Sequence, residues 1–584
     1  MRKKISLFLT VTLLFALAAL ASCSRGSGSA DAKFEAYTNS LFCQEVSSNT
    51  ISLHYTLENP TDYGIKEAPV SFGSCTTDTA SISASAENAL ASLHAHNRAQ
   101  LSDKNKLTYD VLDDYLGISL EEAGYALYDE PLAPLTGTQA QLPVLLSEYQ
   151  FKNTEDIDTY LTLMTKLPEY FESIIAFEQA KSDKGLFMAS YSADDIIDEC
   201  NAFVSMGNDN YLYSSFTERL DAMKLDKAEY DDYVKRNNEN VKDYIFPSYK
   251  KLAEALQALR TTGKNDNGLC YLPDGRDYYE LVVKRETGSS RSVKELKELT
   301  QTQILEDLTA MQQILTSSSK ETFSNAAPAL SDTDPVSILS SLKSKLKGSF
   351  PDPPDVSTEI KYVQKSMEEY LSPAFFMVPA IDSTTDNVIY INQGHMPDDL
   401  SLFTTLAHEG YPGHLYQTVY FQNLKPDPIR NLLNFGGYTE GWATYTEMLS
   451  YYYAPIPKEQ AALLQRNTSV ILGLYALADI GIHYDGWKLM DTVSFFRQYG
   501  IEDANTIESI YDLIISDPAN YLKYYIGYVE FMELKKSTNG AMPSPRKIST
   551  RKCLPLARPL STYSVHTFSN NISPKSFCKS TGPE

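Results

Sequence analysis

Basic residues are scarce in this chain of 584 residues, which carries 51 Lys and Arg against 75 Asp and Glu and has a formal net charge of −24. Proteins that bind nucleic acid neutralise phosphates with Lys and Arg, and an acidic surface repels those phosphates. The composition therefore excludes a nucleic acid partner. It also excludes a disordered acidic chain, because 43% of the residues are hydrophobic and 40 Tyr and 24 Phe can build a large core.

Long apolar runs are also missing, with one exception at the start of the chain. Residues 2–4 are basic, residues 5–21 form an apolar run, and Leu-Ala-Ser-Cys stands at 20–23. A basic start, an apolar stretch and small residues at the cleavage point are typical of a secretory signal. A Cys directly after the small residues is similar to the bacterial lipobox, so we predict a signal peptide at 1–22 and lipidation (palmitate) of Cys23. The alternative is a plain secreted protein in which this Cys is incidental.

The lipid is then the expected link to the membrane. Beyond the start of the chain, no run reaches the roughly 18 apolar residues of a membrane span. We therefore expect an extracytoplasmic protein that is anchored to a bacterial cell membrane by its N-terminal lipid and is otherwise soluble. Small polar residues in the segment 23–32 are typical of a flexible spacer.

Cysteines number seven and include no C-x-x-C pair, so nothing indicates a cysteine metal or redox site. After export, four of them would mature where disulfides can form. These four are Cys43, Cys75, Cys200 and Cys270. They allow three pairings, and the sequence does not choose among them.

The last 44 residues are almost without acidic charge and lack apolar periodicity. Residues 541–584 hold seven Lys and Arg, one acidic residue, six Pro and twelve Ser and Thr. One interpretation is a disordered basic tail. The other is a frameshift, because codons for 542–550 and for 557–562, read one base away, can encode Asp-Ala-Phe-Ser-Pro-Lys-Asp-Phe-His and Gly-Pro-Ala-Pro-Phe-Asp. Resequencing the gene near codon 540 decides between them.

Helical periodicity dominates the rest of the chain. Apolar residues at three-and-four spacing predict helices at 89–99, 108–127, 156–181, 230–259 and 292–316, the last with a capping box at Ser292 and Glu295. Strand-like runs are few, at 375–380 and 387–392. Pro351, Pro353 and Pro354 mark a joint. We therefore predict an N-terminal helical region at 33–355 and a catalytic region at 356–540.

The motif HEGYPGH at residues 408–414 carries the first candidate chemistry. Two His and an adjacent Glu are what a catalytic zinc needs, namely imidazole ligands and a carboxylate that takes a proton from water. Their spacing would place His408 and His414 about 120° apart on an ideal helix. Pro412 and Gly413 can end or kink that helix and bring His414 back beside His408. The alternative is a structural Pro-Gly helix end with incidental His.

Two carboxylates follow downstream. Residues 437–447 predict a helix with Glu440 and Glu447 two turns apart on one face. In an apolar, aromatic stretch both need partners, because burying an unpaired charge is costly. Glu440 is therefore the candidate third ligand, and Glu447 is the candidate residue that orients a ligand His. An ordinary solvated pair on a surface helix remains the alternative.

This set of residues resembles a known family. The motif at 408–414, followed by EGWAxYxE at 440–447, is similar to the bacterial family called domain of unknown function 885. Its layout is similar to that of helical zinc peptidases such as Taq-type carboxypeptidases, thimet-type oligopeptidases and angiotensin-converting enzyme, from whose H-E-x-x-H this chain departs by two inserted residues. The resemblance covers about 356–536 well and the N-terminal region weakly. It implies a mainly α fold: a two-lobed, zincin-like helical body with a deep cleft and a short β element near the active site.

Three further residues are candidates for contact with a substrate. Segments 479–487 and 518–527 match the same family and carry His483 and Tyr524. A zinc hydrolase needs donors aimed at the developing oxyanion, and these two side chains are the candidates. The alternatives are a satisfied core histidine and one of the many tyrosines of a helical core. Asn392, after the second strand-like run, is a weaker candidate for binding substrate backbone.

Together these features predict a lipid-anchored, extracytoplasmic zinc metallohydrolase, a metallopeptidase that cleaves short peptides. One Zn²⁺ would be held by His408, His414 and Glu440, and Glu409 would be the general base. Two other functions stay open: a peptide-binding or solute-binding lipoprotein that does no chemistry, and a metal-dependent hydrolase of a non-peptide amide or ester. The sequence indicates neither the oligomeric state nor the bond that is cut.

Overall fold

The computed structural model describes residues 29–538, apart from 135, 318–329, 364, 366–367, 369–371 and 397. Cys23 and the segment 541–584 lie outside the described residues, so their predictions stay predictions. The described chain is mainly helical and contains one three-stranded sheet, which confirms the mainly α class. Within the described ranges, none of the helices combines the length and the apolar character that crossing a membrane requires.

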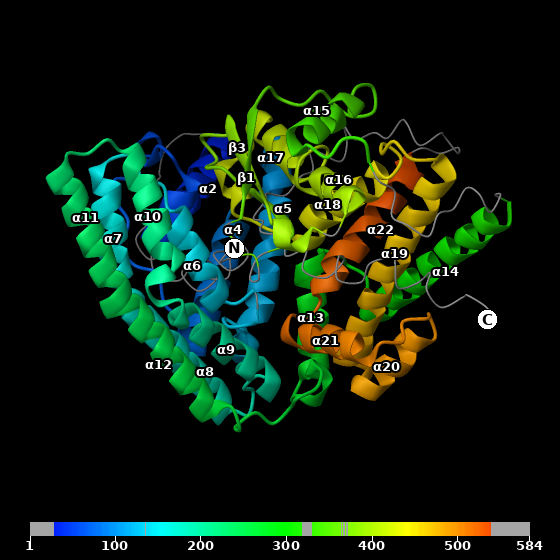
Figure 1. Ribbon diagram of the computed structural model, residues 1–584, viewed down its shortest axis with the longest axis horizontal. Helices are drawn as coiled ribbons and strands as arrows, with labels where there is room; N and C mark the ends of the chain where they lie inside the picture. Colours follow the sequence, from blue (N-terminus) through cyan, green and yellow to red (C-terminus); the bar gives the residue numbers. More distant parts are fainter. Residues whose placement is uncertain are drawn as a thin grey trace. The chain divides into compact units, whose positions relative to one another are not determined.

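The chain divides into two compact units (Figure 1). Unit 1 runs to Asp266 and includes Ala380–Ser383 and Asp427–Leu432, and unit 2 contains the remaining residues. The main division therefore falls near Asp266, whereas the sequence placed a joint at 355/356. The reason lies in packing: helix α13 (Gly275–Thr287) packs on the helices that carry the candidate site, and α14 (Val293–Ser317) packs along another helix of unit 2.

The described part of unit 1 consists of helices and the loops between them, without a strand. Its α-helices are α2 (Ala30–Val46), α3 (Thr50–Thr56), α4 (Thr79–His94), α5 (Asp103–Ala123), α6 (Thr138–Glu148), α7 (Thr154–Met164), α8 (Leu167–Asp183), α9 (Ser190–Ser205), α10 (Tyr211–Ala222), α11 (Lys227–Asn240) and α12 (Phe246–Leu259). The helix predicted at 156–181 is split into α7 and α8. Pro168 explains the break, because its ring disfavours a helix interior and suits a first turn.

Unit 2 holds the remaining helices and the sheet. Besides α13 and α14 it contains α15 (Pro335–Lys345), β1 (Ser357–Tyr362), β2 (Ala374–Met377), β3 (Asp386–Ile391), α16 (Asp399–Glu409), α17 (His414–Asn423), α18 (Gly436–Ser450), α19 (Lys458–Ile480), α20 (Leu489–Arg497), α21 (Ala504–Ser516) and α22 (Asn520–Thr538). The strand order is β1-β3-β2, with β1 parallel and β2 antiparallel to β3. The two strand-like runs of the sequence correspond to β2 and β3. The predicted capping box opens α14, since Ser292 and Glu295 exchange hydrogen bonds of 2.8 and 3.3 Å.

The core of unit 2 surrounds α16, α17 and α18. Leu406 and Trp442 are buried in one cluster that also takes in Phe376 of β2. The indole N–H of Trp442 donates to the Pro412 carbonyl at 2.9 Å, which ties α18 to the link between α16 and α17. Figure 1 shows α18, α22 and α19 beside one another in this unit, in agreement with their packing. The candidate site therefore lies on closely packed helices.

The four cysteines that the sequence left as candidates for disulfide bonds are free thiols. None of the three possible pairings of Cys43, Cys75, Cys200 and Cys270 is formed in the structure.

Candidate metal centre

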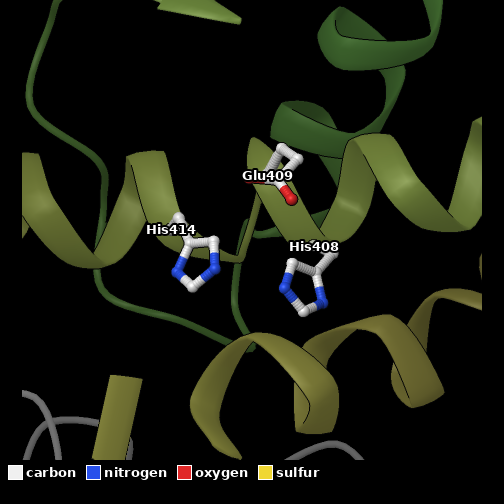
Figure 2. A group of neighbouring side chains, drawn as sticks. All are labelled: His408, Glu409 and His414. Atoms are coloured by element: carbon white, nitrogen blue, oxygen red, sulfur yellow. The ribbon is translucent and has the colours of Figure 1, made fainter. Parts of the chain in front are cut away.

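A break between two helices brings the two histidines of the motif together. Helix α16 ends at Glu409 and α17 begins at His414. The turn between them is tight, since a Cβ atom on Gly413 would lie 1.8 Å from the His408 carbonyl oxygen, and only glycine fits there. The two imidazole rings end with centroids 4.7 Å apart at 80°. Figure 2 shows the rings side by side, with the Glu409 carboxyl group over the gap between them.

Glu440 contacts both rings. Its Oε2 atom lies 3.6 Å from His408 Nε2 and 3.4 Å from His414 Nε2, and all three side chains are buried. A tetrahedral zinc with bonds of about 2.0–2.1 Å separates its ligand atoms by about 3.3–3.4 Å. Glu409 also has a carboxylate oxygen within 4.8 Å of ligand atoms of both histidines. Glu440 is the carboxylate that could hold a metal together with the two histidines, because it contacts both rings directly.

Several polar atoms of this cluster lack a hydrogen-bond partner among the described residues. They are both ring nitrogens of His414 and Oε2 of Glu440. A buried polar atom that makes no hydrogen bond costs about 1–3 kcal/mol, so such groups need an explanation. A cation between the two imidazoles and the carboxylate would satisfy them. The donor set therefore fits a zinc ion.

Electrostatic effects within the cluster are strong. Burial lowers the pKa of His408, but the neighbouring carboxylates of Glu440 and Glu447 outweigh it and raise that pKa to about 10. Burial likewise opposes ionisation of Glu440, but the nearby His414 and His408 hold its pKa well below the usual range. The Glu440 carboxylate thus interacts strongly with both imidazole rings.

Glu447 fixes the orientation of His408. Its Oε2 lies 2.9 Å from His408 Nδ1, so the opposite nitrogen, Nε2, faces Glu440. Two turns of α18 separate Glu440 from Glu447, as the sequence predicted, and both are buried. This is the arrangement by which carboxylates hold metal-binding histidines.

Tyr524 reaches the site because α18 and α22 approach closely. A Cβ atom on Gly441 would lie 2.4 Å from Gly527 of α22, so the two helices meet at glycine. Tyr524, one turn before Gly527, has its ring centroid 6.5 Å from that of His408. Burial, and then the charges of Glu440 and Glu409, raise its pKa well above the usual range. Its hydroxyl group therefore keeps its proton.

Glu409 is held by the sheet. Its Oε2 accepts a hydrogen bond of 2.9 Å from the Phe376 N–H of β2. Burial raises the pKa of Glu409, and the neighbouring His414 and His408 partly offset that effect. Phe376 was not among the residues predicted from the sequence. The strand-like run at 375–380 was its only signal, and that run does not show which edge of the sheet faces the motif.

His483 has a different environment from the one predicted. It lies in the π-helical turn Gly481–Asp485, where its Nδ1 accepts from the Leu269 N–H at 3.1 Å and its Nε2 lies 2.8 Å from the Ile514 carbonyl. Both ring nitrogens thus have backbone partners, and burial lowers the pKa of His483 to about 4. This environment is that of a core histidine, so we do not assign it to the oxyanion.

Asn392 is also held by local backbone. Its amide donates to the Glu368 carbonyl at 2.7 Å and accepts from the Gly394 N–H at 3.1 Å. The side chain is fully buried and shapes the loop after β3. These contacts give no support to the predicted role in binding substrate.

Comparisons with known proteins place the chain in a family. A family model described as "Bacterial protein of unknown function (DUF885)" matches residues 74–544. The chain belongs to the DUF885 family. The match spans every candidate site residue from Asn392 to Tyr524, and a comparison with curated proteins finds no match.

Two solved structures share the fold of this DUF885 protein. One is described as a "putative lipoprotein" from Colwellia psychrerythraea, with a TM-score of 0.70 and 16% identity over 87% of this chain and 92% of that chain. The other is described as a "putative lipoprotein of unknown function" from Shewanella oneidensis, with a TM-score of 0.61 and 14% identity over 90% of this chain and 97% of that chain. At these identities the likeness establishes the fold alone.

Proposed function

We propose that this DUF885 protein is a zinc metallohydrolase that cleaves short peptides, similar in its site to the helical zinc peptidases. The observation that carries the proposal is the convergence of His408 Nε2 and His414 Nε2 on Glu440 Oε2, at 3.6 and 3.4 Å, in a buried site. Two imidazoles and one carboxylate form a donor set typical of catalytic zinc, which keeps a position open for water or substrate.

The chain's own residues supply the remaining roles. A bound zinc ion would lower the pKa of water and polarise the carbonyl group to be cleaved. Glu409, anchored through one oxygen by the Phe376 N–H, would take a proton from the attacking water and pass it to the leaving amine. The Tyr524 hydroxyl would donate to the oxyanion. Glu447 would hold His408 in place.

The sheet favours a peptide substrate. Just before β2, the Pro373 carbonyl accepts from the Asn392 N–H on the side of β3, whereas the Phe376 N–H of β2 points to Glu409. Backbone groups alternate between the two sides of a strand, so Ala374 and Val378 share the Phe376 side. β2 is one of the two edge strands of the described sheet. An extended peptide could pair with this edge and pass beside Glu409.

The proposal includes the location of the protein. We infer that the chain is exported and is attached to a bacterial membrane through lipid on Cys23. The sequence at 2–23 supports this. Two proteins that share the fold are described as putative lipoproteins, which agrees with it.

Zinc analysis combined with a peptide library tests the function. Purified protein should carry one zinc per chain by mass spectrometry, and His414→Ala and Glu440→Ala should lose it. His483→Gln is a matched control, a buried histidine of the same unit, and should keep the metal. Wild type should cleave members of a mixed peptide library, and Glu409→Gln should not.

Other outcomes identify the alternatives. Metal-free protein that binds peptides without cleaving them would contradict the proposal and favour a binding lipoprotein. Zinc-loaded protein that leaves peptides intact but hydrolyses model esters or amides would contradict the peptide substrate alone.

A further inference from the structure

Gln417 is a fully buried polar side chain beside the candidate metal centre. It lies on α17, three residues after His414. Neither its amide oxygen nor its amide nitrogen has a hydrogen-bond partner among the described residues. A glutamine amide can make up to four hydrogen bonds, and burying one that makes none is costly. This side chain therefore needs a hydrogen-bond partner that the described residues do not provide in this structure.

His414 has a matching unfilled position. Its Nε2 faces Glu440, while its Nδ1 has no hydrogen-bond partner in the described part of the chain. Residues three apart on a helix are neighbours, and long helical side chains lean back over the preceding turn. Gln417 therefore reaches toward the turn that begins with His414. An amide oxygen is a suitable acceptor for an imidazole N–H.

We propose that Gln417 is the positioning residue of His414: in the metal-bound protein its side chain turns so that the amide oxygen accepts the Nδ1–H, a hydrogen bond that the described structure does not make, and this keeps Nε2 free for the metal. The inference rests on the proposed function. A histidine that binds a metal through one nitrogen carries its proton on the other, and a partner for that proton fixes the tautomer and the ring. Glu447 has this role for His408, at 2.9 Å. Gln417 would take the same role for His414 as a neutral acceptor.

Zinc affinity tests the inference without reference to activity. Competition with a chromogenic chelator would give zinc dissociation constants for wild type, Gln417→Leu and Gln417→Glu. Loss of a partner that orients a metal ligand weakens binding by about 10–100-fold, so Gln417→Leu should bind zinc that much more weakly. Gln417→Glu, which retains an acceptor, should restore affinity. Gln422→Leu, farther along α17, is the matched control and should bind as wild type does.

Two further measurements separate positioning from general stability. Cobalt-loaded Gln417→Leu should show an altered visible absorption spectrum, because the geometry around the ion changes. The melting temperature of the zinc-free variants should not follow their zinc affinities. If Gln417→Leu does not fold, Gln417→Met replaces it, since it keeps the length of the side chain without the acceptor.

The outcomes distinguish this inference from the proposed function. Wild-type protein that binds no zinc would overturn both. Wild-type protein that binds zinc, with Gln417→Leu or Gln417→Met matching Gln422→Leu in affinity and in cobalt spectrum, would overturn the role of Gln417 alone. A Gln417→Glu variant as weak as Gln417→Leu would also overturn it.

Discussion

Acid should weaken this fold through His483. The ring is fully buried, accepts from the Leu269 N–H at Nδ1 and lies against the Ile514 carbonyl at Nε2. These contacts require the neutral ring with its proton on Nε2, because a second proton on Nδ1 would face an N–H group. Tyr279 stacks on the ring with the two centroids 5.4 Å apart, and its hydroxyl donates to buried Asp479.

The magnitude follows from the two pKa values. Burial lowers the pKa of His483 from 6.5 to about 4 in the folded protein. Because the pKa of His483 is lower in the folded than in the unfolded protein, the neutral ring contributes its full stability above pH 6.5. This contribution is lost as the pH falls toward 4. At pH 4.5 the loss amounts to about 2–3 kcal/mol of unfolding free energy, which is most of the total effect.

His483→Gln is the variant that isolates this effect. A glutamine can accept from one backbone group and donate to the other, but it does not titrate. Other buried groups respond to acid as well: the pKa of His54 is lowered to about 3, and that of Asp479 is raised to about 8, both chiefly by burial. The difference between wild type and variant removes their contributions.

Urea unfolding between pH 4.5 and 7.5 provides the assay. The stability difference between wild type and His483→Gln should shift in favour of the variant by about 2–3 kcal/mol across this range. Parallel pH profiles for the two proteins would refute the assignment of His483 as a neutral core histidine.

Four further predictions address the site, the helix contact and the anchor. Glu409→Gln should lower kcat by about 10²–10⁴-fold in a peptide assay while zinc content stays at one per chain, and loss of zinc would contradict its role as base. Tyr524→Phe should lower kcat by about 10²–10³-fold with little change in KM, and an unchanged kcat would remove it from the mechanism. Gly441→Ala would place a Cβ atom 2.4 Å from the backbone of α22 and should lower the unfolding free energy by about 1–3 kcal/mol or more, whereas Gly117→Ala, with no atom within 4 Å, should not destabilise the protein. Cys23→Ser should move the expressed protein out of the membrane fraction and abolish labelling with palmitate, and a variant that stays membrane-bound would contradict the lipid anchor.

Much of the candidate site could be predicted because its signals are local. Glu440 and Glu447 share a helix face through helical periodicity, and the swing of His414 beside His408 follows from Pro412 and Gly413. The helical class and two of the three strands also follow from local patterns.

The remaining features depend on contacts between distant segments. His483 stands in an apolar helical stretch that suits either a core or a site, and only its contacts with Leu269 and Ile514 separate the two. Phe376 acts through its backbone, so its side chain carries no signal. β1 was not predicted, because its exposed and polar residues lack the pattern of a buried strand. The division near Asp266 depends on the packing of α13 and α14 against other helices of unit 2. The proline cluster near 351 carries no information about that packing.

X-ray absorption at the zinc edge, on protein loaded with one equivalent of zinc, tests the central claim most directly. The account predicts a shell of four or five ligands at about 2.0–2.2 Å, with multiple scattering from two imidazoles and the remaining ligands oxygen. His414→Ala should lose one imidazole from this shell. A spectrum with no imidazole scattering, or with a sulfur ligand at about 2.3 Å, would contradict a zinc centre built from His408, His414 and Glu440.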